Sequence, residues 1–275
     1  MGALGLLLLS HFVGAEVRIE PSVPSTAEAA ELVRVVQDAI VRGPPEVTAL
    51  DARVTVGLAA LEQALASDDG RPIVAAYVTS TEFDSAVAGR NRAHVTAVFS
   101  NPDPRDQVRL ARALLGRSAL GAFDSAATHQ LVQLLGDSVH AIPASGEQKI
   151  DSLLRGAEVF DALVALPDPT LLNRSNISHV VRTLYARRKV LIGYSVTLTR
   201  VGALASVYVS PEAVAGGVVD TLSRYAARGT MPAPAFVSDI DVIVNDRLAR
   251  SLNIAVPEHA DLLDAVRSRR SEGAP

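Results

Sequence analysis

The sequence predicts an α/β protein with two lobes, and three observations support this prediction. The chain has 275 residues, of which 48% are hydrophobic and 20% charged, enough for one large or two medium globular domains. From Arg105 to Tyr194, apolar strand patterns alternate with helix patterns, which is typical of βαβ units on a parallel sheet. Two prolines in Asn101-Pro102-Asp103-Pro104 end the preceding strand and mark the clearest break in the chain. We interpret this break as the first crossover between the lobes.

The composition excludes several kinds of site. The absence of Cys removes disulfides, cysteine nucleophiles and thiolate metal sites together, although it does not fix the cellular compartment. The net charge of -4 offers no basic face for nucleic acid. The six His are scattered without metal-ligand spacing, so we expect neither a metal nor a cofactor. The absence of Trp and an aromatic content of 4% are mild evidence against a sugar ligand, which usually stacks on aromatic rings.

The first fifteen residues resemble a signal peptide. They are apolar and end in the small residues Val13-Gly14-Ala15 before the polar Glu16, and they are too short to span a bilayer. They lack the Lys or Arg usual near the start of such a segment, so a buried first strand and a start codon placed too late remain as alternatives. The sequence therefore predicts a periplasmic or exported protein, and a cytoplasmic one if residues 1–15 are not a signal peptide.

The first lobe is expected to begin with residues 16–100. Apolar runs between turn residues predict its elements, and Gly43-Pro44-Pro45 ends its first helix. The expected strands are 16–20, 47–58, 72–78 and 95–99, and the expected helices are 27–41 and 59–66. A polar loop is expected from Thr79 onward.

The second lobe is expected to begin with residues 101–200. Its strands and helices alternate regularly, which places its strands parallel in one sheet. The expected strands are 119–123, 138–142, 159–166 and 190–194, and the expected helices are 105–115, 125–135, 146–156 and 173–187.

After residue 200 the chain is expected to return to the first lobe and then to cross again. The pattern predicts a connecting strand over 201–209, and Pro211, a favourable first helical residue, begins a helix that ends near Arg228. Gly216-Gly217 within this helix indicates close helix packing. We assign 203–232 to the first lobe, 236–265 with a strand at 241–244 and a helix at 246–252 to the second, and 266–275 to a polar tail.

Polar residues follow several of the expected strands, where ligands bind in open α/β sheets. The candidate ligand-binding residues are Ser80, Thr81, Asp124, Asp168, Tyr194 and Ser195. Asp168 lies between two prolines that stiffen the loop. Its carboxylate could receive a ligand ammonium through a charge-assisted hydrogen bond. The alternative for Asp168 is an acid at a helix N-terminus, stabilised by the helix dipole.

The other candidates also have structural alternatives. Ser195 could donate to a ligand carboxylate and Tyr194 could pack on its apolar part, or they could serve as a turn residue and a core residue. Ser80 and Thr81 could hold an anion with their hydroxyl and N–H groups, or they could cap the following helix. For Asp124, helix capping is the favoured role. Backbone N–H groups at Gly57 could also meet a carboxylate.

The motifs of common enzymes are absent. The segment Gly193-Tyr194-Ser195-Val196-Thr197 has Thr where the nucleophile elbow of a hydrolase needs Gly. Neither of the glycine-rich phosphate-binding motifs occurs after a strand. We therefore expect no catalytic residue, and keep a small α/β hydrolase as a third alternative.

Four stretches together resemble the ABC-transporter substrate-binding protein family, which has the type I periplasmic-binding-protein-like fold. They are Arg71–Val74 with Thr79–Thr81, His94–Pro102, Ala165–Pro169 through Gly193–Ser195 to Leu204, and Val242–Ile254. The resemblance runs from about residue 50 to 257. The chain departs from the family at its start. Members usually have another strand and helix before the segment that resembles 16–40. This difference implies a shortened N-terminal lobe.

The resemblance implies two Rossmann-like lobes joined by a hinge, with a small polar ligand, such as an amino acid, in the cleft between them. Closure around the ligand would be a hinge motion, and the loaded protein would dock on an ABC permease. We expect a monomer that binds no nucleic acid. Because the first lobe is reduced, the second hypothesis is a ligand-sensing or partner-binding module, for example with a membrane sensor, that does not take part in transport.

Overall fold

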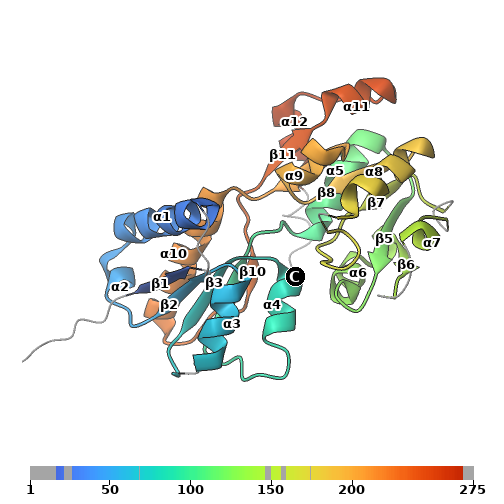
Figure 1. Ribbon diagram of the computed structural model, residues 1–275. Helices are drawn as coiled ribbons and strands as arrows, with labels where there is room; N and C mark the ends of the chain where they lie inside the picture. Colours follow the sequence, from blue (N-terminus) through green and yellow to red (C-terminus); the bar gives the residue numbers. More distant parts are fainter. Residues whose placement is uncertain are drawn as a thin grey trace, which may run out of the picture.

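The structure is a computed structural model that describes residues 17–21, 27–67, 69–145, 150–155, 159–173 and 175–268. Its strands form two separate sheets, each covered by helices, and Figure 1 shows them as two bodies side by side. We call the body around the five-stranded sheet the first lobe and the body around the six-stranded sheet the second lobe. The predicted α/β class with two parallel sheets is therefore confirmed. The predicted signal peptide lies outside the described residues.

The first lobe has an all-parallel sheet. Its strands are, in spatial order, β1 (Arg18–Pro21), β2 (Arg53–Val56), β3 (Ile73–Val78), β4 (Val95–Phe99) and β10 (Ala235–Phe236). Its helices are α1 (Ala27–Arg42), α2 (Pro45–Thr48), α3 (Leu58–Ser67), α4 (Ser80–Ala86) and α10 (Pro211–Arg228). The predicted strand over 47–58 is wrong at its start, because Pro45 begins the short helix α2 and the strand occupies only Arg53–Val56.

The helix α10 belongs to the first lobe although it lies late in the sequence. It packs against α1 and β3, and Figure 1 shows it in orange beside the blue α1. Gly217 lets it approach the sheet, because a Cβ at this position would lie 2.7 Å from Cγ1 of Val98. The close packing predicted from the two glycines is therefore confirmed at Gly217, whereas Gly216 has no other atom within 4 Å of such a Cβ.

A β-bulge ties this helix to the centre of the sheet. The register of β3 shifts between Ala76 and Val78, and Tyr77 between them has a positive φ of 56°. The Tyr77 hydroxyl donates a hydrogen bond to the carbonyl of Pro211 at 2.8 Å. Burial, followed by the nearby carboxylate of Glu212, raises the pKa of Tyr77, so this hydroxyl stays a donor at neutral pH.

The second lobe has a mostly parallel sheet. Its strands are, in spatial order, β11 (Asp241–Val244), β9 (Ala205–Tyr208), β8 (Val190–Gly193), β7 (Ala162–Val164), β5 (Leu120–Asp124) and β6 (His140–Pro143). Among the strands of this lobe that the structure describes, only β11, which pairs with β9, runs antiparallel to its neighbour. The helices are α5 (Pro104–Leu115), α6 (His129–Leu135), α7 (Ile150–Arg155), α8 (Ile177–Ala186), α9 (Val196–Val201), α11 (Asp246–Ser251) and α12 (His259–Arg267), with a 3-10 turn, η1 (Gly136–Ser138).

A buried amide fixes α5 on this sheet. Gln107 is 1% exposed, and its Nε2 donates to the carbonyl of Ala165 at 2.7 Å and to that of Ile192 at 3.3 Å. These two carbonyls lie at the carboxyl ends of β7 and β8, so the bonds hold the sheet edge that carries Asp168 and Tyr194.

The chain passes between the sheets three times, after β4, after β9 and after β10. The assignment of 203–232 to the first lobe needs one correction, because β9 pairs with β8 in the second sheet. Gly202, with a φ of 125°, ends α9 and turns the chain back into this sheet, which also explains why the strand predicted over 201–209 begins only at Ala205. Within the described residues, no helix is long and apolar enough to cross a membrane.

Candidate functional site

Asp168 is buried and bound within its own lobe. It is 3% exposed, and its Oδ1 accepts hydrogen bonds from the backbone N–H groups of Thr170 at 2.8 Å and Leu171 at 2.9 Å. Its Oδ2 accepts a bond from the Ser125 hydroxyl at 2.6 Å. A carboxylate has about four lone-pair positions, so these bonds leave room for one further donor. Asp168 thus stabilises the turn that follows it, and its role toward a ligand remains a prediction.

Charged groups of both lobes affect the pKa of Tyr194. Burial, and after it the carboxylates of Glu82 and Asp168, raise the pKa of Tyr194 to about 12. Glu82 is on α4 of the first lobe, whereas Asp168 follows β7 of the second, so both lobes place negative charge near one phenol. Among the described residues the Tyr194 hydroxyl has no hydrogen-bond partner, and it is a neutral donor at pH 7.

The N-terminus of α4 is largely satisfied by its own lobe. The Thr79 hydroxyl accepts from the backbone N–H of Glu82 at 3.3 Å, and a Glu82 oxygen accepts from the backbone N–H of Thr79 at 2.7 Å, which is a capping box. The backbone N–H of Ser80 donates to Oδ1 of Asn101 at 2.8 Å, and Thr81 is only 7% exposed. Because Glu82 adds a negative charge here, the geometry favours a capping role for this turn over the predicted anion site.

Asp124 and Ser195 also make local bonds at strand ends. Oδ1 of Asp124 lies 2.9 Å from Nδ1 of His129 in the first turn of α6. The Ser195 hydroxyl accepts from the backbone N–H of Leu198 at 3.3 Å and caps α9. Within the described part of the chain, no hydrogen bond joins Ser195 to a His, and Gly57 at the end of β2 uses its N–H on the carbonyl of Ala76.

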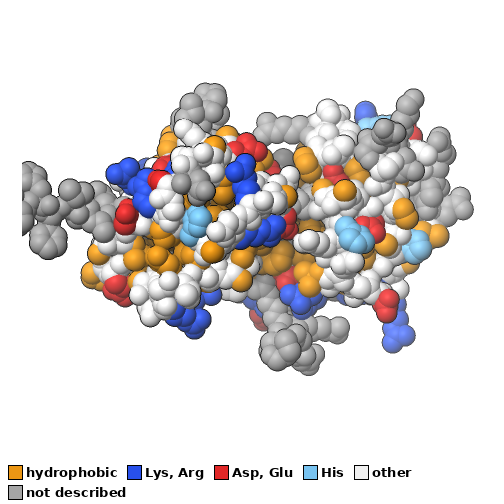
Figure 2. Space-filling view, turned by 90° about the horizontal axis from the view of Figure 1, so that it is seen from below, with side chains coloured by type: hydrophobic (Ala, Val, Ile, Leu, Met, Phe, Trp, Pro, Cys, Tyr) orange, Lys and Arg blue, Asp and Glu red, His pale blue; other side chains and the backbone are white. Residues whose placement is uncertain are grey.

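The arrangement suits an ammonium group more than an anion. Its charged side chains are the carboxylates of Glu82 and Asp168, and the free Tyr194 hydroxyl can bond a second polar group. No three carboxylate or imidazole groups of the described residues converge on a metal position. On the face seen in Figure 2, Lys and Arg side chains are scattered among acidic and uncharged ones.

Sequence reasoning missed three residues of this arrangement, namely Glu82, Asn101 and Ser125. The pattern Thr79-Ser80-Thr81-Glu82 is a capping-box sequence and could have predicted both α4 and the position of Glu82. The bonds from the Ser80 N–H to Asn101 and from the Ser125 hydroxyl to Asp168 join distant segments, so no local pattern indicates them.

Solved structures of the same architecture match nearly the whole chain. An ABC domain from Streptococcus pneumonia, solved in complex with L-Trp, has a TM-score of 0.61 and 16% identity over 92% of this chain and 98% of that one. The type I periplasmic-binding-protein-like fold is therefore established for this chain. A conserved domain protein from Vibrio cholerae has this fold with a TM-score of 0.57 and 19% identity over 85% and 82% of the two chains.

A third match is a substrate-binding protein with adhesive properties from Clostridium difficile, in a ligand-free, open structure. Its TM-score is 0.57 and its identity 13% over 84% of this chain and 82% of that one. No protein-family profile matches the sequence, and no curated protein matches it. At identities below 20% these likenesses establish the fold, which is the one that the sequence resemblance implied.

Proposed function

We propose that this chain is a solute-binding protein that captures a small polar molecule between its lobes for an ABC importer. The fold supports this proposal, since matched proteins are described as an ABC domain with bound L-Trp and as a substrate-binding protein. The predicted site lies at the carboxyl ends of β3, β5, β7 and β8, where ligands bind in parallel α/β sheets.

The observation that carries the proposal is the Tyr194 hydroxyl, which has negative charge near it from both lobes. A ligand ammonium placed here would offset the mutual repulsion of Glu82 and Asp168 and so favour their approach. The Tyr194 hydroxyl would donate to a ligand carboxylate or carbonyl oxygen. An amino acid has both groups, and it is the ligand class that we propose.

Export and delivery complete the proposal. The N-terminal segment supports a periplasmic or extracellular location through its signal-peptide pattern. A permease would recognise the loaded form, and we infer that the chain acts by binding and not by catalysis, because Ser195 caps a helix and lacks a His partner among the described residues.

Calorimetric titration with the standard amino acids and small amines tests this proposal. Saturable binding of at least one amino acid with its free ammonium is expected, and the matching N-acetyl amino acid should bind at least tenfold more weakly, because acetylation removes the charge at roughly 1.4 kcal/mol per factor of ten. Absence of binding at millimolar concentrations, by protein shown to be folded, would reject solute capture.

The variant Glu82→Gln separates the charge of Glu82 from its capping role. In Glu82→Gln the capping box persists, because glutamine also serves at this position. We expect this variant to keep its stability and to bind the amino acid roughly five to ten times more weakly.

Tyr194→Phe removes a hydroxyl that has no partner among the described residues, and it should weaken binding by about 1 kcal/mol without loss of stability. Unchanged affinity in both variants would place the ligand elsewhere.

A further inference from the structure

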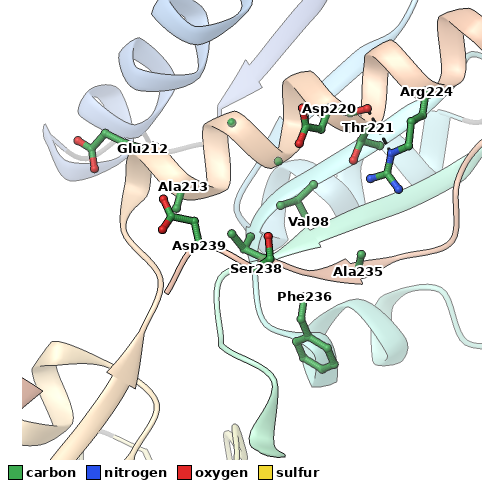
Figure 3. Close-up of a pocket in the computed structure, with 13 residues that line it drawn as sticks. Val98, Glu212, Ala213, Asp220, Thr221, Arg224, Ala235, Phe236, Ser238 and Asp239 are labelled. Atoms are coloured by element: carbon green, nitrogen blue, oxygen red, sulfur yellow. Dashed lines mark hydrogen bonds between the residues drawn. The ribbon is translucent and has the colours of Figure 1, made fainter. Parts of the chain in front are cut away.

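A separate pocket lies in the first lobe, between α10 and the edge strand β10. Its volume is about 370 Å³, and its walls are one stripe of α10, Val98 of β4 and residues 235–239 (Figure 3). The segment 237–239 belongs to the third connection between the sheets, and Glu212 follows the second. None of the predicted ligand-binding residues lines this pocket, so it is distinct from the site between the lobes.

The charges around this pocket, which we call the α10 pocket, are mainly negative. Glu212, Asp220 and Asp239 line it, against a single basic residue, Arg224. Figure 3 shows Glu212 and Asp239 towards one end and Arg224 at the other, where its Nε donates to the backbone carbonyl of Asp220 at 3.3 Å. Asp239 also pairs with Arg267 at 3.3 Å, but this pair is exposed and leaves Asp239 accessible.

The wall of the pocket includes a hydroxyl without a partner among the described residues. Thr221 is 4% exposed, it lines the α10 pocket, and its side chain makes no hydrogen bond to any described residue. The oxygen of this hydroxyl is not among the fully buried atoms that lack a partner, so it is reachable from the pocket and can bond a polar group of a ligand. Beside it the floor is apolar, formed by Val98 and Val237, and the space over Gly216 is empty.

The spacing of the acids excludes a metal ion and favours an extended cation. No three acidic or imidazole groups of the described residues converge closely enough to hold a metal. Glu212 and Asp220 are eight residues apart on α10, which corresponds to about 12 Å along the helix axis. Two separated carboxylates with an apolar floor between them match a molecule whose positive charges are joined by methylene groups.

We propose that the α10 pocket binds a linear aliphatic polyamine. One ammonium group lies at Glu212 and Asp239, another lies at Asp220 and the Thr221 hydroxyl, and the methylene chain covers Val98 and Val237. The proposal does not depend on ligand capture between the lobes, because the two sites share no residue.

Spermidine titration, followed by the backbone amide signals of the full chain in NMR, tests the proposal. Saturable shifts are expected at Gly216, Thr221 and Ser238, and glutarate, an anion with a similar apolar spacer, should produce none. Shifts that follow ionic strength alone, or that centre on Glu82 and Tyr194, would overturn the proposal, the second result by placing the polyamine between the lobes.

Charge variants give opposite expected results within the same pocket. Glu212→Gln and Asp220→Asn should each weaken spermidine binding roughly threefold, whereas Arg224→Gln should strengthen it by a similar factor. Equal weakening in all three variants would contradict charge recognition. These residues are exposed, so the substitutions should leave the folded structure intact.

A filling variant tests the position of the ligand directly. Gly216 has room for a side chain, so Gly216→Leu should fill the α10 pocket and abolish spermidine binding without lowering the melting temperature. Gly216→Ala, which adds one methyl group, is the matched control that should retain binding. Spermidine binding that survives Gly216→Leu with an unchanged affinity would reject this site, whatever the outcome of the amino-acid titrations.

Discussion

The Tyr194 side chain lies close enough to both lobes for a carboxylate of each to affect its pKa. Its hydroxyl is free of protein partners in the described structure, and its neutral form is favoured by burial and by the carboxylates of Glu82 and Asp168. Because Asp168 is already held by three hydrogen bonds, it is a fixed charge and not a mobile one. A fixed acid and a free hydroxyl are the kind of pre-positioned groups that bind a small ligand without a large ordering cost.

The raised pKa of Tyr194 predicts a stability change at high pH. Its pKa is about 12 in the folded chain, against an ordinary tyrosine pKa of 10.0, so its contribution to stability is fully present below pH 10 and is lost as the pH rises through 12. Denaturation at pH 9 and pH 12 should therefore show a larger loss in the wild type than in Tyr194→Phe, by up to about 2–3 kcal/mol. Comparison of the two proteins cancels the other tyrosines, and equal losses would contradict this environment.

Buried hydroxyls without partners predict stabilising substitutions. Oγ1 of Thr96 is buried in β4 and has no hydrogen-bond partner. Thr96→Val keeps the shape and removes the unsatisfied group, so urea unfolding should show a gain of about 1 kcal/mol. Thr199→Val is the control, because the Thr199 hydroxyl is bound to the Ser206 hydroxyl at 2.7 Å and its loss should destabilise the chain. Losses of equal size in both variants would contradict the assignment.

At the scale of elements, α4 illustrates how a short helix depends on its cap. Its seven residues are too few for a hydrophobic periodicity to indicate a helix, which is why the sequence predicted a loop. The capping box at its start and the buried Phe83 stabilise it instead. This helix carries Glu82 toward Tyr194, so the cap also positions part of the proposed site.

Removal of the cap should lower the stability of the protein and leave the charge of Glu82 in place. Thr79→Ala deletes the hydroxyl that accepts from the backbone N–H of Glu82, and it should cost about 1 kcal/mol in thermal or urea unfolding. The variant keeps the Glu82 carboxylate, so at temperatures where it is folded it should bind the amino acid more strongly than Glu82→Gln does. If Thr79→Ala leaves the unfolding free energy unchanged, the cap does not stabilise α4.

The elements with strong local signals could be predicted from the sequence. The strand over 95–99 and the helix from Pro211 to Arg228 were predicted with the observed bounds, since both have clear limits in proline or polar residues. The strand predicted over 47–58 extended too far because apolar β-branched residues continue through the short helix α2. Helices of six or seven residues, such as α4 and α9, depend on caps and on tertiary packing.

The candidate site could be predicted only in part. The carboxyl ends of the strands correctly indicated the sheet edge on which Asp168 and Tyr194 lie. The partners of these residues could not be predicted, because the charge of Glu82 reaches Tyr194 only through the placement of one lobe against the other. The same limit applies to the α10 pocket, whose walls come from segments more than 100 residues apart.

At the scale of the whole molecule, three connections join the two sheets. In the proposed function, the lobes approach when a ligand ammonium is bound near Glu82 and Asp168, because repulsion between these carboxylates is then offset. The absence of Cys allows two labels to be placed cleanly at exposed positions, with Glu62→Cys on α3 and Gln130→Cys on α6.

The distance between spin labels on these two cysteines, measured by pulsed electron paramagnetic resonance, tests whether the lobes close on a ligand. We predict a shorter and narrower distance distribution on saturation with the amino acid that binds in calorimetry. The doubly labelled Glu82→Gln variant should show a smaller change at the same concentration, because it binds the amino acid more weakly. A distribution that stays the same in the labelled wild-type chain at saturation would contradict ligand capture between the lobes.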